Sequence, residues 1–116
     1  MTAVGSETST DPLDRALSER ARLVELCVYA LDRTGSSGVA ERLAEGLGHV
    51  GVAALRPEGG VFDPSAHEAG GVVDTDDPSL DGVIAGTEVA GFADRERVLR
   101  VPVVAVYRLR REPSGR

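Results

Sequence analysis

Apolar residues recur with a helical period between residues 13 and 33. Three of them repeat at seven-residue spacing and two more adjoin that stripe: Leu17, Val24, Leu31, Leu13 and Cys27. Arg20 interrupts the stripe. Asp11 and Pro12 stand ahead of it as a typical N-cap and first helical residue. The pattern predicts a helix of about five turns that begins there.

The middle of this helix, Leu23 to Leu31, is apolar on nearly every face. A helix with more than one apolar face needs more than one packing partner. We therefore expect a helix from a second chain to cover it, with an interface built from Leu17, Val24, Cys27, Leu31, Leu43 and Leu47.

The segment from Thr34 to Gly38 breaks the first helix, and Ser36 or Ser37 can cap a second one. One face of that second helix, of about three turns, carries Val39, Leu43, Leu47 and Val50. Gly48 is its expected C-terminal cap. The two helices predict a hairpin, which would form half of a dimeric four-helix bundle.

The period changes after Gly51. Residues 52–55 form a short apolar run, and the apolar residues at 72–73 and 83–85, which the acidic loop separates, predict two brief strands. The clearest strand alternates from Leu99 to Leu109, and Pro102 predicts that it lies at a sheet edge or is bulged there. The fold class is thus α+β: an N-terminal helical hairpin (residues 11–50) followed by a small antiparallel β-domain (51–110), with mobile tails at 1–10 and 111–116.

The composition changes this picture in two ways. Only 3% of the 116 residues are aromatic, so the core is expected to be aliphatic and the chain to gain stability from pairing. The 13 basic residues, all arginine, are outnumbered by 19 acidic ones, and this argues against binding to nucleic acid. We interpret the arginines near the C-terminus as solvent-exposed residues of the chain end.

The remaining bulk features point to the cytoplasm. Cys27 is the single cysteine, so no intrachain disulfide can form. The first residues lack the charged and apolar regions of a signal peptide, and no apolar stretch is long enough to span a bilayer. We expect a cytoplasmic chain without membrane attachment.

His67 is the one histidine in a recognisable context, close to Asp63 and Glu68. A catalytic base would need a nucleophile, and none stands in a suitable motif. One histidine with loop carboxylates is also a thin metal-ligand set. We therefore expect no catalytic residue, no metal and no cofactor, and we interpret Phe62, Asp63, Pro64 and His67 as a structural turn.

Two other loops fail as ligand sites. The acidic loop at residues 74–78 lacks the glycine and the glutamate of a calcium-binding EF-hand. The glycine pairs at residues 59–60 and 70–71 do not open a helix after a strand, so they are not phosphate cradles.

Two separated motifs remain: G-x-x-F-D-P-x-x-H-E-A, at residues 59–69, and G-F-x-x-x-x-R-V-L-R followed by a valine-rich run, from residue 91. Together they resemble the β-domain of the GrpE family, the nucleotide exchange factors of DnaK-type chaperones. The resemblance is strong over about half of the chain and weaker over most of the rest.

The resemblance implies a function and a set of site residues. GrpE proteins are homodimeric co-chaperones in protein folding and the stress response. Their β-domain wedges into the partner's ATPase domain and promotes ADP release, without covalent chemistry. Arg100 stands where the family carries an arginine that faces the chaperone, and Pro102, Val103 and Phe92 would flank it.

The chain also departs from the family pattern. About twenty residues precede the matching helical segment, so we expect the long N-terminal stalk helix to be missing. Gly70 and Gly71 replace bulkier residues, and Pro102 stands one position later than the family's usual proline. The alternative function is therefore a GrpE-derived interaction module, or a regulator, without exchange activity.

Overall fold

The computed structural model describes residues 11–111, so the expected tail at 1–10 and, except for Arg111, the expected tail at 111–116 lie outside the described residues. The chain divides into two compact units, one up to Val50 and one from Gly51 onward. The first contains two helices and the second six short strands with one 3₁₀ turn. The α+β fold class is confirmed.

The helices form as their caps predict. Helix α1 spans Pro12–Arg33 and begins at Asp11, whose carboxylate accepts a hydrogen bond from the Leu13 amide at 3.0 Å. Helix α2 spans Ser37–His49, and the Ser36 hydroxyl oxygen accepts from the Val39 amide at 3.1 Å. Ser36 rather than Ser37 is therefore the cap.

The end of α2 differs from the expectation. Gly48 lies inside the helix, and Val50 is the C-cap. The residue with a left-handed backbone is Gly51, at φ 92°, immediately after the cap. Glycine is needed at the residue that turns the chain away from the helix, because only there does the backbone enter the left-handed region.

The two helices pack through a short apolar contact. Val24 of α1 and Leu47 of α2 are the buried side chains of this unit. Arg20, which interrupts the apolar stripe, donates from Nη2 to the Val50 carbonyl oxygen at 2.6 Å. A cation is favourable at a helix C-terminus, so this arginine closes the free end of α2.

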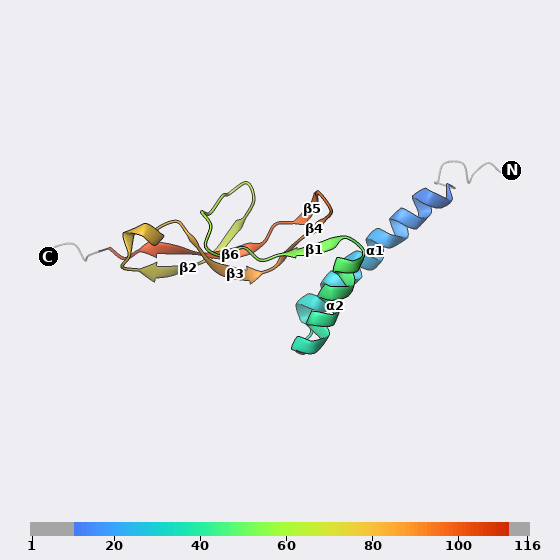
Figure 1. Cartoon of the computed structure of the whole chain (residues 1–116), viewed down its shortest axis with the longest axis horizontal. Coiled ribbons are helices and arrows are strands. Elements are labelled where there is room, and N and C mark those ends of the chain that lie inside the picture. Colours follow the sequence, from blue (N-terminus) through green and yellow to red (C-terminus); the bar gives the residue numbers. More distant parts are fainter. Residues whose placement is uncertain (1–10, 112–116) are drawn as a thin grey trace. The chain divides into compact units, whose positions relative to one another are not determined.

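Helix α1 is much longer than α2. Its 22 residues span about 33 Å and the 13 residues of α2 about 20 Å. The first two turns of α1 therefore extend past the end of α2 (Figure 1). Leu13 and Leu17 lie on those turns and are exposed.

The β-unit consists of two three-stranded sheets. The first sheet is antiparallel, in the order β1–β4–β5, and its strands are Val52–Leu55, Gly91–Asp94 and Arg97–Arg100. The second sheet has the order β2–β6–β3, and its strands are Glu68–Thr75, Val103–Leu109 and Ile84–Val89. The 3₁₀ turn η2, Pro78–Leu80, follows β2.

The second sheet is mixed, where the sequence predicted antiparallel pairing throughout. Strand β6 lies between β2 and β3 (Figure 1), parallel to β2 and antiparallel to β3. A parallel pair needs a long connection between its strands. The segment from Asp76 to Pro102 provides it, because it contains β3, β4 and β5.

The expected long strand from Leu99 to Leu109 is divided in two. Val101 and Pro102 separate β5 in the first sheet from β6 in the second. Pro102 thus marks a change of sheet, because a residue without an N–H cannot continue the ladder. β6 is the central strand of its sheet, whereas β5 is an edge strand.

The core of the β-unit is small and mostly aliphatic. Its fully buried side chains are Phe92, Ile84, Val52 and Val104. Phe92 is the one aromatic residue among them and is 1% exposed. Val52 and Phe92 belong to the first sheet, and Ile84 and Val104 to the second.

Candidate protein-interaction site on the β-unit

The turn at residues 62–67 is held by its own side chains. The Asp63 carboxylate accepts hydrogen bonds from the Ser65 amide at 3.0 Å and the Ser65 hydroxyl at 2.8 Å. These bonds, the amide first, hold the pKa of Asp63 below its ordinary value of 3.8. The carboxyl group is therefore ionised and engaged, which makes it a poor proton acceptor.

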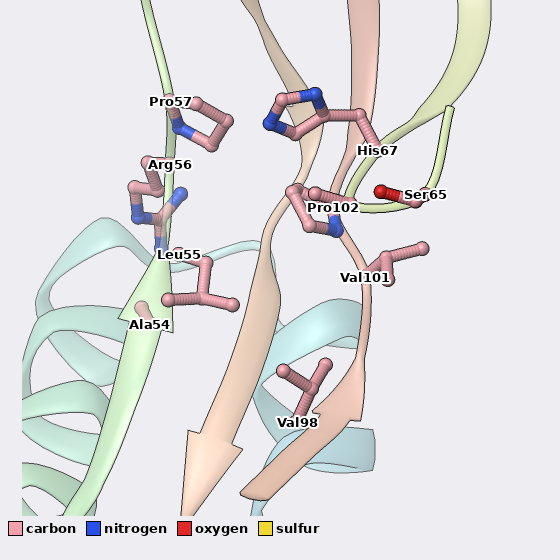
Figure 2. Close-up of a pocket in the computed structure, with 10 residues that line it drawn as sticks. Ala54, Leu55, Arg56, Pro57, Ser65, His67, Val98, Val101 and Pro102 are labelled. Atoms are coloured by element: carbon pink, nitrogen blue, oxygen red, sulfur yellow. The ribbon is translucent and has the colours of Figure 1, made fainter. Parts of the chain in front are cut away.

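His67 closes the same turn. Its Nδ1 accepts a hydrogen bond from the Asp63 amide at 3.0 Å, and its ring lies 5.9 Å from that of Phe62 between centroids. An accepting Nδ1 places the proton of the neutral ring on Nε2. The imidazole is half-buried and points across a groove toward Pro57 (Figure 2).

The groove is formed by three segments of the β-unit. They are the end of β1 with the two residues after it, the 62–67 turn, and β5 with its link to β6. Its volume is about 560 Å³, within the range of ligand pockets. The lining residues are Ala54, Leu55, Arg56, Pro57, Ser65, Ala66, His67, Val98, Val101 and Pro102.

Arg100 lies at the end of β5. Its Nε donates to the Ala90 carbonyl oxygen at 2.9 Å, and its guanidinium carbon lies 5.4 Å from the centre of the Phe92 ring. The arginine is half-buried, and its position is fixed by a hydrogen bond and a cation–π contact. Part of the residue remains accessible.

The residues expected to flank Arg100 are placed differently from one another. Val103 is half-buried, whereas Phe92 and Pro102 are buried. A buried side chain has little surface for a partner. The Phe92 ring contacts the Arg100 guanidinium, and Pro102 lines the groove and stands at the change of sheet.

Arg97 is the arginine that the sequence analysis did not single out. It opens β5, is exposed, and lies opposite Asp94 of β4. Within the described part of the chain, its guanidinium makes no hydrogen bond or ion pair. The sequence did contain a signal for Arg97, its position as the first arginine of the R-V-L-R run. Successive side chains of a strand face opposite sides of the sheet, so the two arginines of this run need not be equally accessible.

The residues expected at a dimer interface fall into three groups. Val24 and Leu47 are already buried within the hairpin, Cys27, Leu31 and Leu43 are half-buried, and Leu17 is exposed. Two further leucines that the interface prediction did not name are strongly exposed, Leu23 at 62% and Leu26 at 61%. Helix α1 thus has an apolar surface that α2 does not cover.

Among residues 11–111, no group of three or more histidine, cysteine or carboxylate side chains is placed to hold a metal ion. No helix within the described residues is long and apolar enough to cross a membrane.

Comparison with known proteins places these features in one family. The family model described as GrpE matches residues 9–108. Curated proteins named Protein GrpE from Trichormus variabilis and from a Nostoc species are each 39% identical over 69 residues, 60% of this chain. The match covers 27% of the length of each relative. Because the family model spans both the helical unit and nearly all of the β-unit, the chain belongs to the GrpE family.

Proposed function

We propose that this chain is a co-chaperone that promotes ADP release from the ATPase domain of a DnaK-type chaperone. The observation that carries the proposal is the edge strand β5, which presents an exposed arginine, Arg97, on a compact β-unit of the GrpE family. Arginine is enriched at binding hot spots and can contact a carboxylate through two hydrogen bonds. No bond is made or broken in this function, so the chain acts as a binding protein and not as an enzyme.

The mechanism is differential binding. A factor that binds the open state of a nucleotide cleft more tightly than the closed state shifts the population toward the open state. Two features suit this role. The β-unit has a buried core, and the position of Arg100 is fixed by Ala90 and Phe92, so little ordering is needed on binding.

Within this proposal the β5 arginines have different roles. Arg97 contacts the partner directly, and Arg100 adds contact through its accessible part. Phe92 and Pro102 hold the strand in place, and Val103 contributes its half-buried surface.

A nucleotide-release assay tests the proposal. The native chain is expected to accelerate the release of a fluorescent ADP from the cognate DnaK-type ATPase domain. Arg97→Ala is expected to weaken this effect about tenfold at subsaturating concentration, since loss of a hot-spot side chain costs more than about 1 kcal/mol. Arg100→Ala is measured beside it, and a smaller loss is expected because the Arg100 side chain is half-buried and offers a partner less surface than Arg97.

The matched control is Arg111→Ala, which removes an exposed arginine after the last strand and should have no effect. No acceleration by the native chain would exclude exchange activity. Binding to the ATPase domain without acceleration would instead indicate the alternative, an interaction module that lacks exchange activity.

We also propose that the helical unit forms a homodimer. The exposed leucines of α1 support this, because Leu23 and Leu26 are three residues apart, lie next to each other on the helix surface, and leave apolar area exposed. The partner is a second copy, whose hairpin would complete a four-helix bundle.

Sedimentation tests the dimer. The native chain is expected to sediment as a dimer at micromolar concentration, and Leu23→Glu combined with Leu26→Glu as a monomer, because burying two carboxylates at the interface is costly. Glu25→Gln, an exposed change between them, is the control. A native monomer at that concentration would refute the dimer.

A further inference from the structure

The groove of the β-unit has an unusual charge pattern for this protein. The whole chain has a formal charge of −6, yet none of the ten lining residues is acidic. Most of them are apolar, and the two ionisable ones are Arg56 and His67. Glu58 and Glu68 directly follow the lining residues Pro57 and His67 in sequence but do not line the groove, and the Asp63 carboxylate is engaged by Ser65.

Of the two ionisable groups in the groove, the chain holds His67 in position and leaves Arg56 without a partner among residues 11–111. The His67 ring is fixed through Nδ1, and so its Nε2–H is directed toward Pro57 across the groove (Figure 2). Arg56, which follows β1, is exposed and makes no hydrogen bond or ion pair within residues 11–111. Both groups are hydrogen-bond donors, and neither is satisfied by the chain at those atoms.

The walls of the groove are apolar. Leu55 and Ala54 line one side, and Val98 and Val101 line the other (Figure 2). Two prolines, Pro57 and Pro102, stiffen the backbone on either side. A groove that is already formed binds with a smaller ordering cost.

We propose that this groove binds an extended, apolar segment that carries a carboxylate side chain, on the surface of the partner's ATPase domain. The apolar side chains of the segment lie against Leu55, Val98 and Val101, and its carboxylate is bound by the Arg56 guanidinium. The His67 Nε2–H donates to a backbone carbonyl oxygen of the segment. The inference rests on the proposed function, and it assigns a second contact surface beyond Arg97.

Charge complementarity selects this occupant. A basic segment would meet Arg56 with no carboxylate in the lining to compensate it, and like charges placed together cost several kcal/mol at an interface. A second copy of this chain is a weaker fit, because the apolar surface suited to self-association lies on α1.

The test measures binding of the full chain to the nucleotide-free ATPase domain by titration calorimetry. Arg56→Glu and, separately, Val98→Asp are each expected to weaken binding about tenfold or more. Val98 is 54% exposed, so its replacement should leave the fold intact, and a circular dichroism melt of each variant checks this. Arg56→Lys should retain most of the affinity, and Arg111→Glu, with the same charge change as Arg56→Glu, should retain all of it.

The outcomes separate this inference from the function on which it rests. If Arg97→Ala weakens binding while Arg56→Glu and Val98→Asp do not, the groove proposal is overturned and the exchange proposal stands. If Arg111→Glu weakens binding as much as Arg56→Glu, the effect is one of net charge and the groove proposal is also overturned. A native chain that does not bind the ATPase domain overturns both.

Discussion

Phe92→Ala is expected to leave the β-unit largely unfolded while the helical unit persists. Phe92 is 1% exposed and is the single aromatic side chain among the fully buried residues. Truncating a buried phenylalanine to alanine costs about 3–5 kcal/mol. A unit of roughly 60 residues has a total stability of only about 3–9 kcal/mol, at the usual value per residue. The free energy lost on this substitution is therefore comparable to the total stability of the β-unit.

The two tyrosines allow this result to be measured for the β-unit alone. Tyr29 lies in α1 and Tyr107 in β6, and the chain contains no tryptophan. In a Tyr29→Phe background, tyrosine emission during urea unfolding reports Tyr107.

Phe92→Leu, which keeps most of the volume, should lose less than about 1.5 kcal/mol. Val61→Ala, at a site 75% exposed, should change the free energy of unfolding little. A Phe92→Ala variant with native stability would contradict the assigned core.

Gly91→Ala is expected to destabilise the β-unit by about 2–3 kcal/mol, because an added methyl group has no space. A Cβ at this position would lie 2.6 Å from the Arg100 carbonyl oxygen, 2.6 Å from the Pro102 nitrogen and 2.7 Å from the Pro102 Cδ. Two of these atoms belong to the backbone and the third to a proline ring, so none can move aside cheaply. The close approach of β4 to the β5–β6 link thus requires glycine.

Gly86→Ala is the matched control within the same unit. Gly86 lies in β3, its added Cβ would meet nothing within 4 Å, and its φ is not in the left-handed region. This substitution should be neutral or stabilise by up to about 1 kcal/mol, since alanine restricts the unfolded chain. Equal unfolding free energies for Gly91→Ala and Gly86→Ala would show that the crowding at Gly91 is absent in solution.

Local chemistry made much of the fold predictable. The Asp11-Pro12 start, the Ser36 cap and the division into helices and strands all depend on residues close together in sequence. The parallel pairing of β2 with β6 could not be predicted in this way, because it depends on how three intervening strands are accommodated. Pro102 was recognised as a break in the pattern, but the sequence gives no sign that the strands on its two sides belong to different sheets.

The candidate site was predictable only in part. The motifs identified the turn and the arginine-bearing strand, and the resemblance drew attention to Arg100. The structure shows that Arg97 is more exposed than Arg100, because the Arg100 guanidinium packs against Phe92. The sequence motif does not reveal this contact. The groove escaped prediction because Leu55, His67 and Val101 come from three separate segments that carry no common motif.

The change of sheet at Pro102 has a mechanical consequence. An applied force on the β5 edge passes along a short covalent backbone segment directly into β6, the strand at the centre of the other sheet. Because β6 is hydrogen-bonded to β2 on one side and to β3 on the other, a load applied at the edge strand β5 is distributed over the hydrogen bonds of both pairs. The two sheets are therefore connected mechanically by the backbone of residues 101 and 102.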